Sequence, residues 1–479
     1  MEDTNSIQVA TCTGAELFSA ALGSQSTAES PSLKCSEGLA ICGRLTIPEY
    51  QRPYRWGAQQ LENLLSDIQA HKQRTPDLPY YLGSLILHQA HTPADAGHTS
   101  HLNIIDGQQR ITTLALLALV LGENRLQAGS LSLEHPISQN NVVKNITWLK
   151  EQDIEELKRT VNLSELQFSL VVTQSEDDAY RFFETQNTGG VRLSGPDIIK
   201  AHHLRAVDRA YLKDYALKWE SLGNLNKSVL AILRGRYWQR IGWCDLPRHN
   251  QKPQIRDTVV NELASKTGNA GVDISYGRMK RVITHSGVIS MSTPGQGYDM
   301  RQPLNAGTNT IHYVEYFQRL YQRYWQSPES VHVQGYSEFI AWLKRQKGCG
   351  YLQDLFESCL LLYISQFGEE KLTAAAKKIF RVVYSRRVSN QKAVRENSVP
   401  AFVKDYPVLD WIVMSFTPEQ CFARFDDFKL EVDPSNLDKK SIKRRYMNEV
   451  VKVFGLTLSE DDYKTQFADA LSRKIRELV

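Results

Sequence analysis

The chain has 479 residues, of which 42% are hydrophobic and 23% are charged, and this profile predicts a globular protein of two or three domains with a large core. The formal net charge of +4 excludes a uniformly basic nucleic-acid binder, so any nucleic-acid contact must be local. The seven cysteines contain no CxxC pair, and neither a leader nor a membrane-spanning run is visible, which argues against a zinc knuckle or a disulfide framework and predicts a soluble cytoplasmic protein.

The first 56 residues are predicted to be largely irregular. Residues 1–44 are rich in Ser, Thr, Ala and Gly and read as an N-terminal arm with a short helix around Ala15–Leu22. The next stretch, LTIPEYQRPYRW (45–56), is held extended by two prolines. Its aromatic residues alternate with polar ones that suit a base-stacking face beside a phosphate grip (Gln51, Arg52, Arg55). A structural loop whose aromatics fill a core edge is the alternative.

Regular elements are predicted from residue 59 onward by the spacing of apolar residues. The expected helices are Gln59–His71, Ile111–Leu121 and Val142–Val161. The expected strands are Tyr80–His88, Leu102–Ile105 and Leu166–Val172. This mixture predicts an α+β domain.

A polar turn joins the strand at 102–105 to the apolar helix at 111–121. The first N–H groups of a helix lack intrahelical partners and attract anions. Gly107 lets the backbone approach a ligand, Gln108 and Gln109 can donate hydrogen bonds, and Arg110 can bind phosphate in bidentate fashion. The alternative is an ordinary corner in which Asp106 caps the helix and Arg110 is solvated.

A second polar cluster lies in AYRFFETQNTGGVRLSGPDIIKAHHL (179–204). Asn187 begins a glycine-rich breaker, and Ser194 to Asp197 resemble a capping-box start with a proline in the first turn. Lys200 follows one turn into the new helix. These residues suit a second wall of a polar pocket, so we expect the separated segments to converge on one polyphosphate cavity. A helix–turn–helix corner with a solvated Lys200 is the alternative.

Three segments together resemble one family, the GmrSD-type restriction proteins. They are IPEYQRPYRW (47–56), YLGSLIL followed by IIDGQQRITTL (104–114), and FFETQNTGGVRLSGPDIIK (182–200). The resemblance covers about residues 45–205 and is to the N-terminal, GmrS-like domain, whose fold is similar to that of ParB and sulfiredoxin. It implies that this domain binds and hydrolyses a nucleoside triphosphate with a divalent metal such as Mg²⁺. In the family, this activity is coupled to an HNH-type nuclease that attacks foreign, often modified, phage DNA.

The resemblance also implies roles for matching residues. It assigns catalysis to the turn (Asp106, Gln108, Gln109, Arg110), with Asp106 as a metal contact. It assigns nucleotide binding to the surrounding positions (Gln51, Arg52, Arg55, Gly107, Asn187, Asp197, Lys200). No HNH pattern follows residue 205, so the chain is expected to be a regulatory subunit that gates a partner nuclease. A non-hydrolysing nucleotide- or DNA-binding adaptor, and a nickase acting through the ParB-like domain, are the alternatives. The sequence leaves the oligomeric state open, a homo-oligomer included.

Residues 206–479 are predicted to form a mainly helical domain, with long connecting loops at 245–310 and aromatics that belong to its core. A second feature is a cationic run without an acid between its members. We expect this run to contact DNA phosphates, and the alternative is a solvated helix face. Its members are Lys377, Lys378, Arg381, Arg386, Arg387, Lys392 and Arg395. A shorter basic run lies at 438–452.

Overall fold

The computed structural model divides the chain into two compact units, Met1–Leu193 and Ser194–Val479. It describes residues 7–21, 33–34, 40–41, 43–90, 101–123, 131–175, 179, 194–238, 246–275, 280–283, 289–292, 297–391, 394–437 and 441–478. In these ranges, none of the helices has the length and apolar character that crossing a membrane requires.

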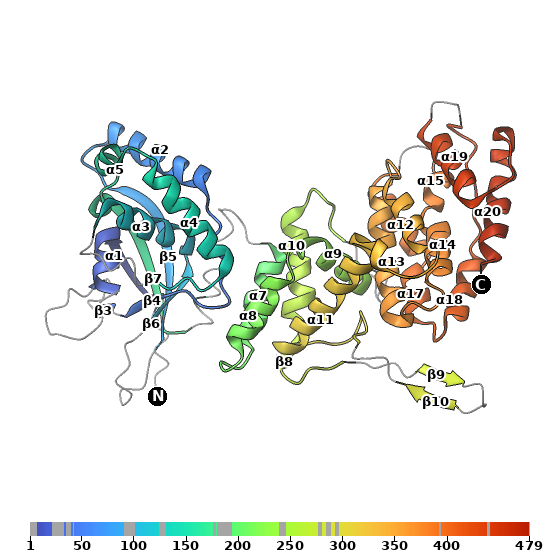
Figure 1. The fold of residues 1–479 in the computed structure, drawn as a ribbon, viewed down its shortest axis with the longest axis horizontal. Helices are drawn as coiled ribbons and strands as arrows, with labels where there is room; N and C mark the ends of the chain where they lie inside the picture. The colour runs from blue at the N-terminus through green and yellow to red at the C-terminus, as the bar shows by residue number, and fades with distance from the viewer. Residues whose placement is uncertain are drawn as a thin grey trace. The chain divides into compact units, whose positions relative to one another are not determined.

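The N-terminal unit is built on a mixed five-stranded sheet with the order β1-β7-β5-β6-β4 (Figure 1). Its strands are β1 (Gln8–Thr13), β4 (Arg44–Thr46), β5 (Tyr80–Ala90), β6 (His101–Asp106) and β7 (Leu166–Thr173). The central strand β5 runs parallel to β7 and antiparallel to β6, whereas the edge strands β1 and β4 pair antiparallel with β7 and parallel with β6. Two short strands, β2 (Leu33–Lys34) and β3 (Ala40–Ile41), pair separately.

Helices complete this unit around an apolar core. They are α1 (Gly14–Ala21), α2 (Ala58–Arg74), α3 (Gln108–Leu121), α4 (Pro136–Lys150) and α5 (Ile154–Thr160), followed by the 3-10 turn η3 (Leu163–Glu165). Helix α3 is buried from Gln108 to Ala118 except at Arg110, because from Ile111 to Ala118 its residues are apolar or threonine around the whole circumference. It packs against α4 and α5, while α2 packs against α5 and β5. The helix most central to the core therefore presents its N-terminus at the end of β6.

The C-terminal unit is mainly helical. Its first helices are α7 (Gly195–Arg205), α8 (Leu212–Ser221), α9 (Asn226–Tyr237), α10 (Lys252–Val260) and α11 (Thr308–Leu320), with π-helical turns η4 (Asn261–Ser265) and η5 (Tyr321–Gln326). After the 3-10 turn η6 (Pro328–Ser330) come α12 (Tyr336–Lys344), α13 (Gly350–Phe367), α14 (Leu372–Val383), α15 (Ser385–Ser389), α16 (Ser398–Asp405), α17 (Val408–Val413) and α18 (Pro418–Asp427). The chain ends with α19 (Ile442–Phe454), the 3-10 turn η7 (Glu460–Lys464) and α20 (Phe467–Arg476).

Short strands also occur in this unit. They are β8 (Gly268–Ala270), which pairs with β11 (Asn305–Ala306), and β9 (Lys280–Ile283), which pairs with β10 (Ile289–Ser292). The buried helix α13 lies at the centre of the helical packing and contacts α9, α11, α14, α16 and α17. The expected α+β class with a helical C-terminal part is confirmed.

The helix expected at Val142–Val161 is divided into α4 and α5 by residues 151–153. Two further regions also differ from the sequence-based expectation. The N-terminal arm contributes β1, whose side chains alternate between buried and exposed, to the main sheet. Residues 245–310 contain α10, η4 and four short strands rather than loops alone. In both regions tertiary pairing forms strands that local propensity does not predict. Strand β1 pairs with the distant β7, whereas β8 to β11 pair with one another within residues 245–310.

Candidate functional site

The turn between β6 and α3 depends on a glycine. Gly107 has φ +97° and is the N-cap residue of α3, which has no side-chain cap. A Cβ atom at this position would lie 2.1 Å from Cδ2 of Leu85, so a larger residue is excluded by both backbone strain and contact. The alternative interpretation, in which Asp106 caps the helix, is therefore wrong. The uncapped N–H groups of the first turn remain available to an acceptor.

Arg110 connects this turn to a bulge in β5. The register of β5 against β7 shifts between Tyr81 and Ser84, which turns backbone carbonyls out of the ladder. Nη1 of Arg110 donates to the Leu82 carbonyl at 2.7 Å, and Nη2 donates to the Ser84 carbonyl at 2.8 Å and to the Asp106 carboxylate at 3.3 Å. Arg110 is therefore not a solvated side chain, and much of its donor capacity serves the protein itself.

The aromatic loop at residues 47–57 docks on the same helix end. Oε1 of Gln109 accepts hydrogen bonds from the backbone N–H groups of Arg55 at 2.8 Å and Trp56 at 3.2 Å, and its Nε2 donates to the Pro53 carbonyl. Gln51 donates to the carbonyl of Ile105, the residue before Asp106, at 2.8 Å. Two of the three predicted segments thus come together, and Gln109 is the residue that joins them.

Tyr54 anchors this loop in the core. It is fully buried and Tyr50 is 6% exposed, so for these two rings the base-stacking expectation is wrong and the alternative, in which the loop's aromatics fill a core edge, is confirmed. The hydroxyl of Tyr54 lies 2.8 Å from Oγ1 of Thr113 and accepts from Nδ2 of Asn145 at 3.0 Å. Burial raises the pKa of this hydroxyl, so it stays protonated. Ser138 and Asn145, both buried polar residues on α4, bind the loop backbone at Tyr54 and Trp56. Their positions on a polar helix gave no local signal of this role.

Gln108 has an unusual environment. Its side chain is 6% exposed, yet its Oε1 has no hydrogen-bond partner in the described structure. The Oγ1 atom of Thr112, one turn further along α3, is buried in the same way. Leaving a buried acceptor unpaired costs about 1–3 kcal/mol. An acceptor kept in this state beside a helix N-terminus can bind a donor or a cation of a ligand.

A family model for the GmrSD restriction endonuclease N-terminal domain matches residues 37–204. Residues 37–204 are therefore similar to the N-terminal domain of the GmrSD restriction endonucleases. The resemblance drawn from the three sequence segments is therefore confirmed, while a ParB-like fold stays a prediction. A second model, of a family of unknown function (DUF7834), matches residues 212–441. No curated protein matches the chain.

The third of the segments that resemble the GmrSD family, residues 182–200, is only partly described, and Asn187 lies outside the described residues. Ser194 and Asp197 form the predicted capping box: the Ser194 side chain accepts from the Asp197 N–H, and the Asp197 carboxylate accepts from Ser194 Oγ at 2.7 Å. Lys200 is 2% exposed, and its Nζ lies 2.7 Å from Oε1 of Glu220. The solvated Lys200 of the alternative interpretation is therefore wrong, and nucleotide binding by Asp197 and Lys200 stays a prediction.

Arg52 and Arg55 remain suited to an anion. In the described part of the chain, neither side chain makes a hydrogen bond or ion pair. The side chain of Arg55 is exposed and that of Arg52 is partly exposed. The backbone N–H of Arg55 is bonded to Gln109. The loop therefore holds the Arg55 guanidinium near the start of α3.

The expected DNA-binding run is wrong for three of its members. Lys378, Arg381 and Arg387 are 1%, 1% and 5% exposed. Lys378 pairs with the Asp426 carboxylate at 2.8 Å, and Arg381 donates to the Phe428 carbonyl and to Ser472. The acid that neutralises Lys378 is distant in the sequence, so the run itself gave no sign of it.

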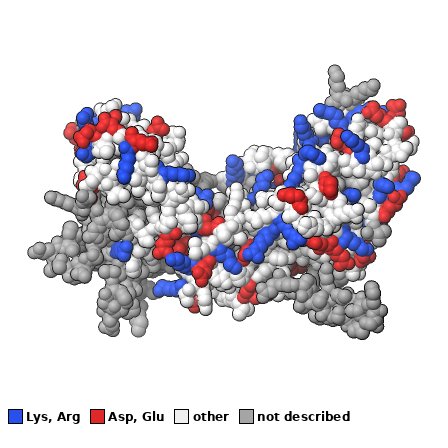
Figure 2. Space-filling model, in the orientation of Figure 1, with Lys and Arg blue, Asp and Glu red and all other residues white. Residues whose placement is uncertain are grey.

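The remaining members of the run have mixed environments. Lys377 and Arg386 are partly buried over aromatic rings, Arg395 is exposed, and Lys392 lies outside the described residues. On the face drawn in Figure 2, Lys and Arg side chains are interspersed with Asp and Glu. DNA binding through the exposed members stays a prediction.

Proposed function

We propose that the GmrSD N-terminal domain binds and hydrolyses a nucleoside triphosphate at the β6–α3 turn, and that turnover controls a partner nuclease, of HNH type, that restricts foreign DNA. The family match supports the restriction context, because its model describes the N-terminal domain of restriction endonucleases. The observation at Gln108 supports the nucleotide site most directly. Its buried amide oxygen has no partner in the described structure, and it lies beside the uncapped N-terminus of α3, where anionic groups bind.

The surrounding residues have distinct roles in this proposal. The N–H groups of the first turn of α3 receive phosphate oxygens, and Arg52 and Arg55 supply positive charge. Gln108 accepts a hydrogen bond from the ligand or contributes an oxygen to a cation. Gln109 and Arg110 act mainly as positioning residues, because their side chains fix the aromatic loop and the β5 bulge.

The residues at the turn fit a magnesium ion that arrives with the nucleotide. Mg²⁺ prefers oxygen ligands and is commonly held by one or two carboxylates together with substrate phosphates. Asp106 offers a carboxylate with 29% side-chain exposure, and Gln108 offers an amide oxygen. Among the described residues, no group of three or more His, Cys, Asp and Glu could hold a metal alone. A bound ion would neutralise phosphate charge during transfer.

The test replaces Gln108 by leucine, which has similar volume but no acceptor. We expect nucleotide affinity in the presence of Mg²⁺ to fall about 10-fold or more and phosphate release to fall with it, because a bound donor loses its partner. The melting temperature should stay equal or rise, since an unpaired buried acceptor is removed. Titration with a fluorescent nucleotide, a phosphate-release assay and thermal melting measure the three quantities.

Gln59→Leu is the matched control, because Gln59 is an exposed glutamine on α2 that bonds only to its neighbour Asn63 in the described structure. It should bind and hydrolyse like the wild type. Normal binding and turnover by Gln108→Leu would refute the site. Nucleotide binding without phosphate release by the wild-type chain would favour the adaptor function, and nicking of plasmid by the purified chain would favour the nickase.

A further inference from the structure

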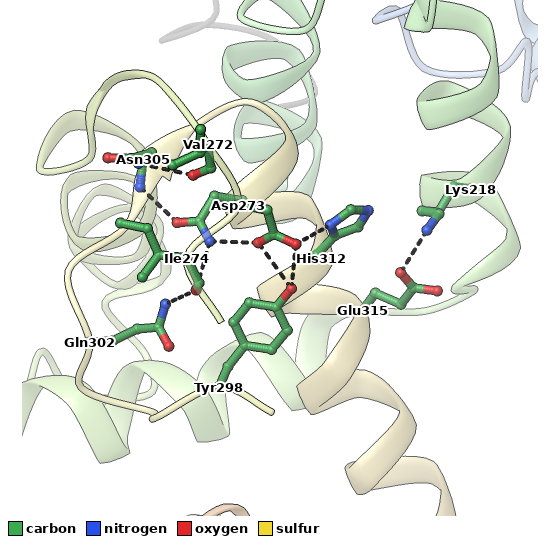
Figure 3. Close-up of polar contacts among 10 residues, drawn as sticks. Lys218, Val272, Asp273, Ile274, Tyr298, Gln302, Asn305, His312 and Glu315 are labelled. Atoms are coloured by element: carbon green, nitrogen blue, oxygen red, sulfur yellow. Dashed lines mark hydrogen bonds and ion pairs between the residues drawn. The ribbon is translucent and has the colours of Figure 1, made fainter. Parts of the chain in front are cut away.

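A second polar centre lies in the helical unit, around Asp273 (Figure 3). The Asp273 carboxylate lies 2.7 Å from Nδ1 of His312, and it accepts hydrogen bonds from the Tyr298 hydroxyl at 2.9 and 3.0 Å and from Nδ2 of Asn309 at 2.8 Å. His312 and Asn309 lie on successive turns of α11. The side chains of His312 and Asp273 are 24% and 26% exposed, so solvent and a ligand can reach them.

The backbone on both sides of Asp273 is fixed by amide side chains. The Val272 carbonyl accepts from Nδ2 of Asn305 at 3.1 Å. The Ile274 carbonyl accepts from Nε2 of Gln302 at 2.8 Å and from Asn309 at 3.1 Å. The carboxylate is thus held rigidly against one nitrogen of an imidazole, which is the arrangement that orients a histidine for proton transfer.

The contact with Asp273 determines the state of Nε2, the other ring nitrogen of His312. With Nδ1–H donated to Asp273, the neutral imidazole carries its lone pair on Nε2. Nε2 makes no hydrogen bond in the described structure and points away from the carboxylate (Figure 3). This tautomer and orientation are those that a general base requires.

The facing side of α8 indicates what this base acts on. Tyr211, Tyr215 and Lys218 have the spacing of one helix face. The ring of Tyr215 lies 5.3 Å from that of His312, and Tyr211, one turn earlier, is 59% exposed. An exposed ring and a partly exposed ring beside a cation are suited to the stacking and phosphate contacts that bind single-stranded nucleic acid.

Two cations also lie on this part of α8 and α11. Nζ of Lys218 lies 3.1 Å from the Glu315 carboxylate and 5.7 Å from the centre of the Tyr215 ring. Arg319 pairs with the same carboxylate. Lys218 and Arg319 are matched by two acids, Glu315 and Asp273, but the two cationic side chains are 36% and 72% exposed, so their charged groups can still contact a phosphodiester.

We propose that His312 and Asp273 form a second reactive site that cleaves single-stranded RNA. Nε2 of His312 accepts the proton of a ribose 2′-hydroxyl, and O2′ forms a bond to the adjacent phosphorus. The bond from phosphorus to O5′ breaks, O5′ takes a proton from solvent, and the imidazolium returns its proton to solvent. RNA provides its own adjacent nucleophile, so one oriented base suffices to start the reaction. The products are a 2′,3′-cyclic phosphate and a 5′-hydroxyl. This activity is independent of the proposed nucleotide hydrolysis.

The test incubates the full chain with an end-labelled single-stranded RNA in EDTA and identifies the product ends by mass spectrometry. We expect cyclic-phosphate products from the wild type and a 10²- to 10⁴-fold lower rate from His312→Gln. RNA affinity, measured by fluorescence anisotropy, should be retained. Added imidazole should restore cleavage by His312→Ala, which a purely structural defect would not allow.

His332→Gln is the matched control, because His332 is an exposed histidine in the same unit, and it should cleave at the wild-type rate. DNA of the same sequence should bind without being cut. The proposal is overturned if the wild type leaves RNA intact, if His312→Gln cleaves equally, or if the products carry 3′-hydroxyl and 5′-phosphate ends.

Discussion

At the scale of single residues, Gly83 lets Arg110 reach the β5 bulge. Gly83 has φ +99°, and a Cβ atom there would lie 2.4 Å from Nη1 of Arg110. The arginine would have to move, and the Leu82 and Ser84 carbonyls would lose their donor. Geometry at the start of α3 therefore depends on a glycine in another element.

We expect Gly83→Ala to lower the free energy of unfolding by about 1–3 kcal/mol more than Gly122→Ala, in urea denaturation of the full chain. Gly122 also has a positive φ of +76°, but a Cβ atom there meets nothing within 4 Å. The control therefore carries backbone strain without displacement of a partner. Equal losses in the two variants would mean that the Arg110 contacts add no stability.

At the scale of elements, α14 shows how a cationic helix can be structural. Lys378 and Arg381 lie on its buried side, where Asp426 of α18 faces both, at 2.8 and 3.9 Å. Burial lowers the pKa of Arg381, and the Asp426 charge opposes this effect. Removing one partner of a buried pair leaves an uncompensated charge.

Asp426→Asn should therefore destabilise the C-terminal unit by about 3–5 kcal/mol, measured by chemical denaturation followed by circular dichroism. Its neighbour Asp427 is exposed and makes no hydrogen bond or ion pair in the described structure. Asp427→Asn should change stability by less than about 0.5 kcal/mol. A small effect of Asp426→Asn would show that solvent reaches Lys378.

The same elements show what the sequence could and could not predict. The apolar run from Ile111 and the capping box at Ser194 are local signals, and both elements form as predicted. Two other features depend on partners that are not adjacent in the sequence. Strand β1 forms by pairing with β7, and Lys200 is buried because it pairs with Glu220. The sequence predicted that the aromatic loop and the start of α3 lie close together, but not that Gln109 joins them by hydrogen bonds. The burial of Lys378 required knowledge of tertiary contacts.

At the scale of the whole molecule, each unit has its own core, and that of the C-terminal unit contains a neutral histidine. His203 is fully buried, with Nε2 2.7 Å from the Leu263 carbonyl and Nδ1 accepting from the Gly307 N–H. Burial lowers its pKa to about 3, because an imidazolium would lose solvation and also oppose the Gly307 donor. The unfolded chain binds a proton at the ordinary pKa near 6.5.

The unfolded state therefore binds more protons between about pH 6.5 and 3, and stability must fall as the pH decreases through this range. We expect a loss of about 2 kcal/mol for the C-terminal unit between pH 7 and pH 5, seen in denaturation curves at the two pH values. His203→Gln should remove most of this dependence, and His332→Gln should leave it unchanged. An identical pH dependence in His203→Gln would contradict a neutral His203.

Strand β1 has a practical consequence for work on the N-terminal unit. Strand β1 is an edge strand of the sheet and pairs with β7, the next strand inward. A shortened protein that begins after Thr13 would leave the N–H and C=O groups along β7 unsatisfied, and such edges recruit strands from other molecules. Shortened forms would thus be prone to self-association, and affinity tags are better fused at the opposite terminus.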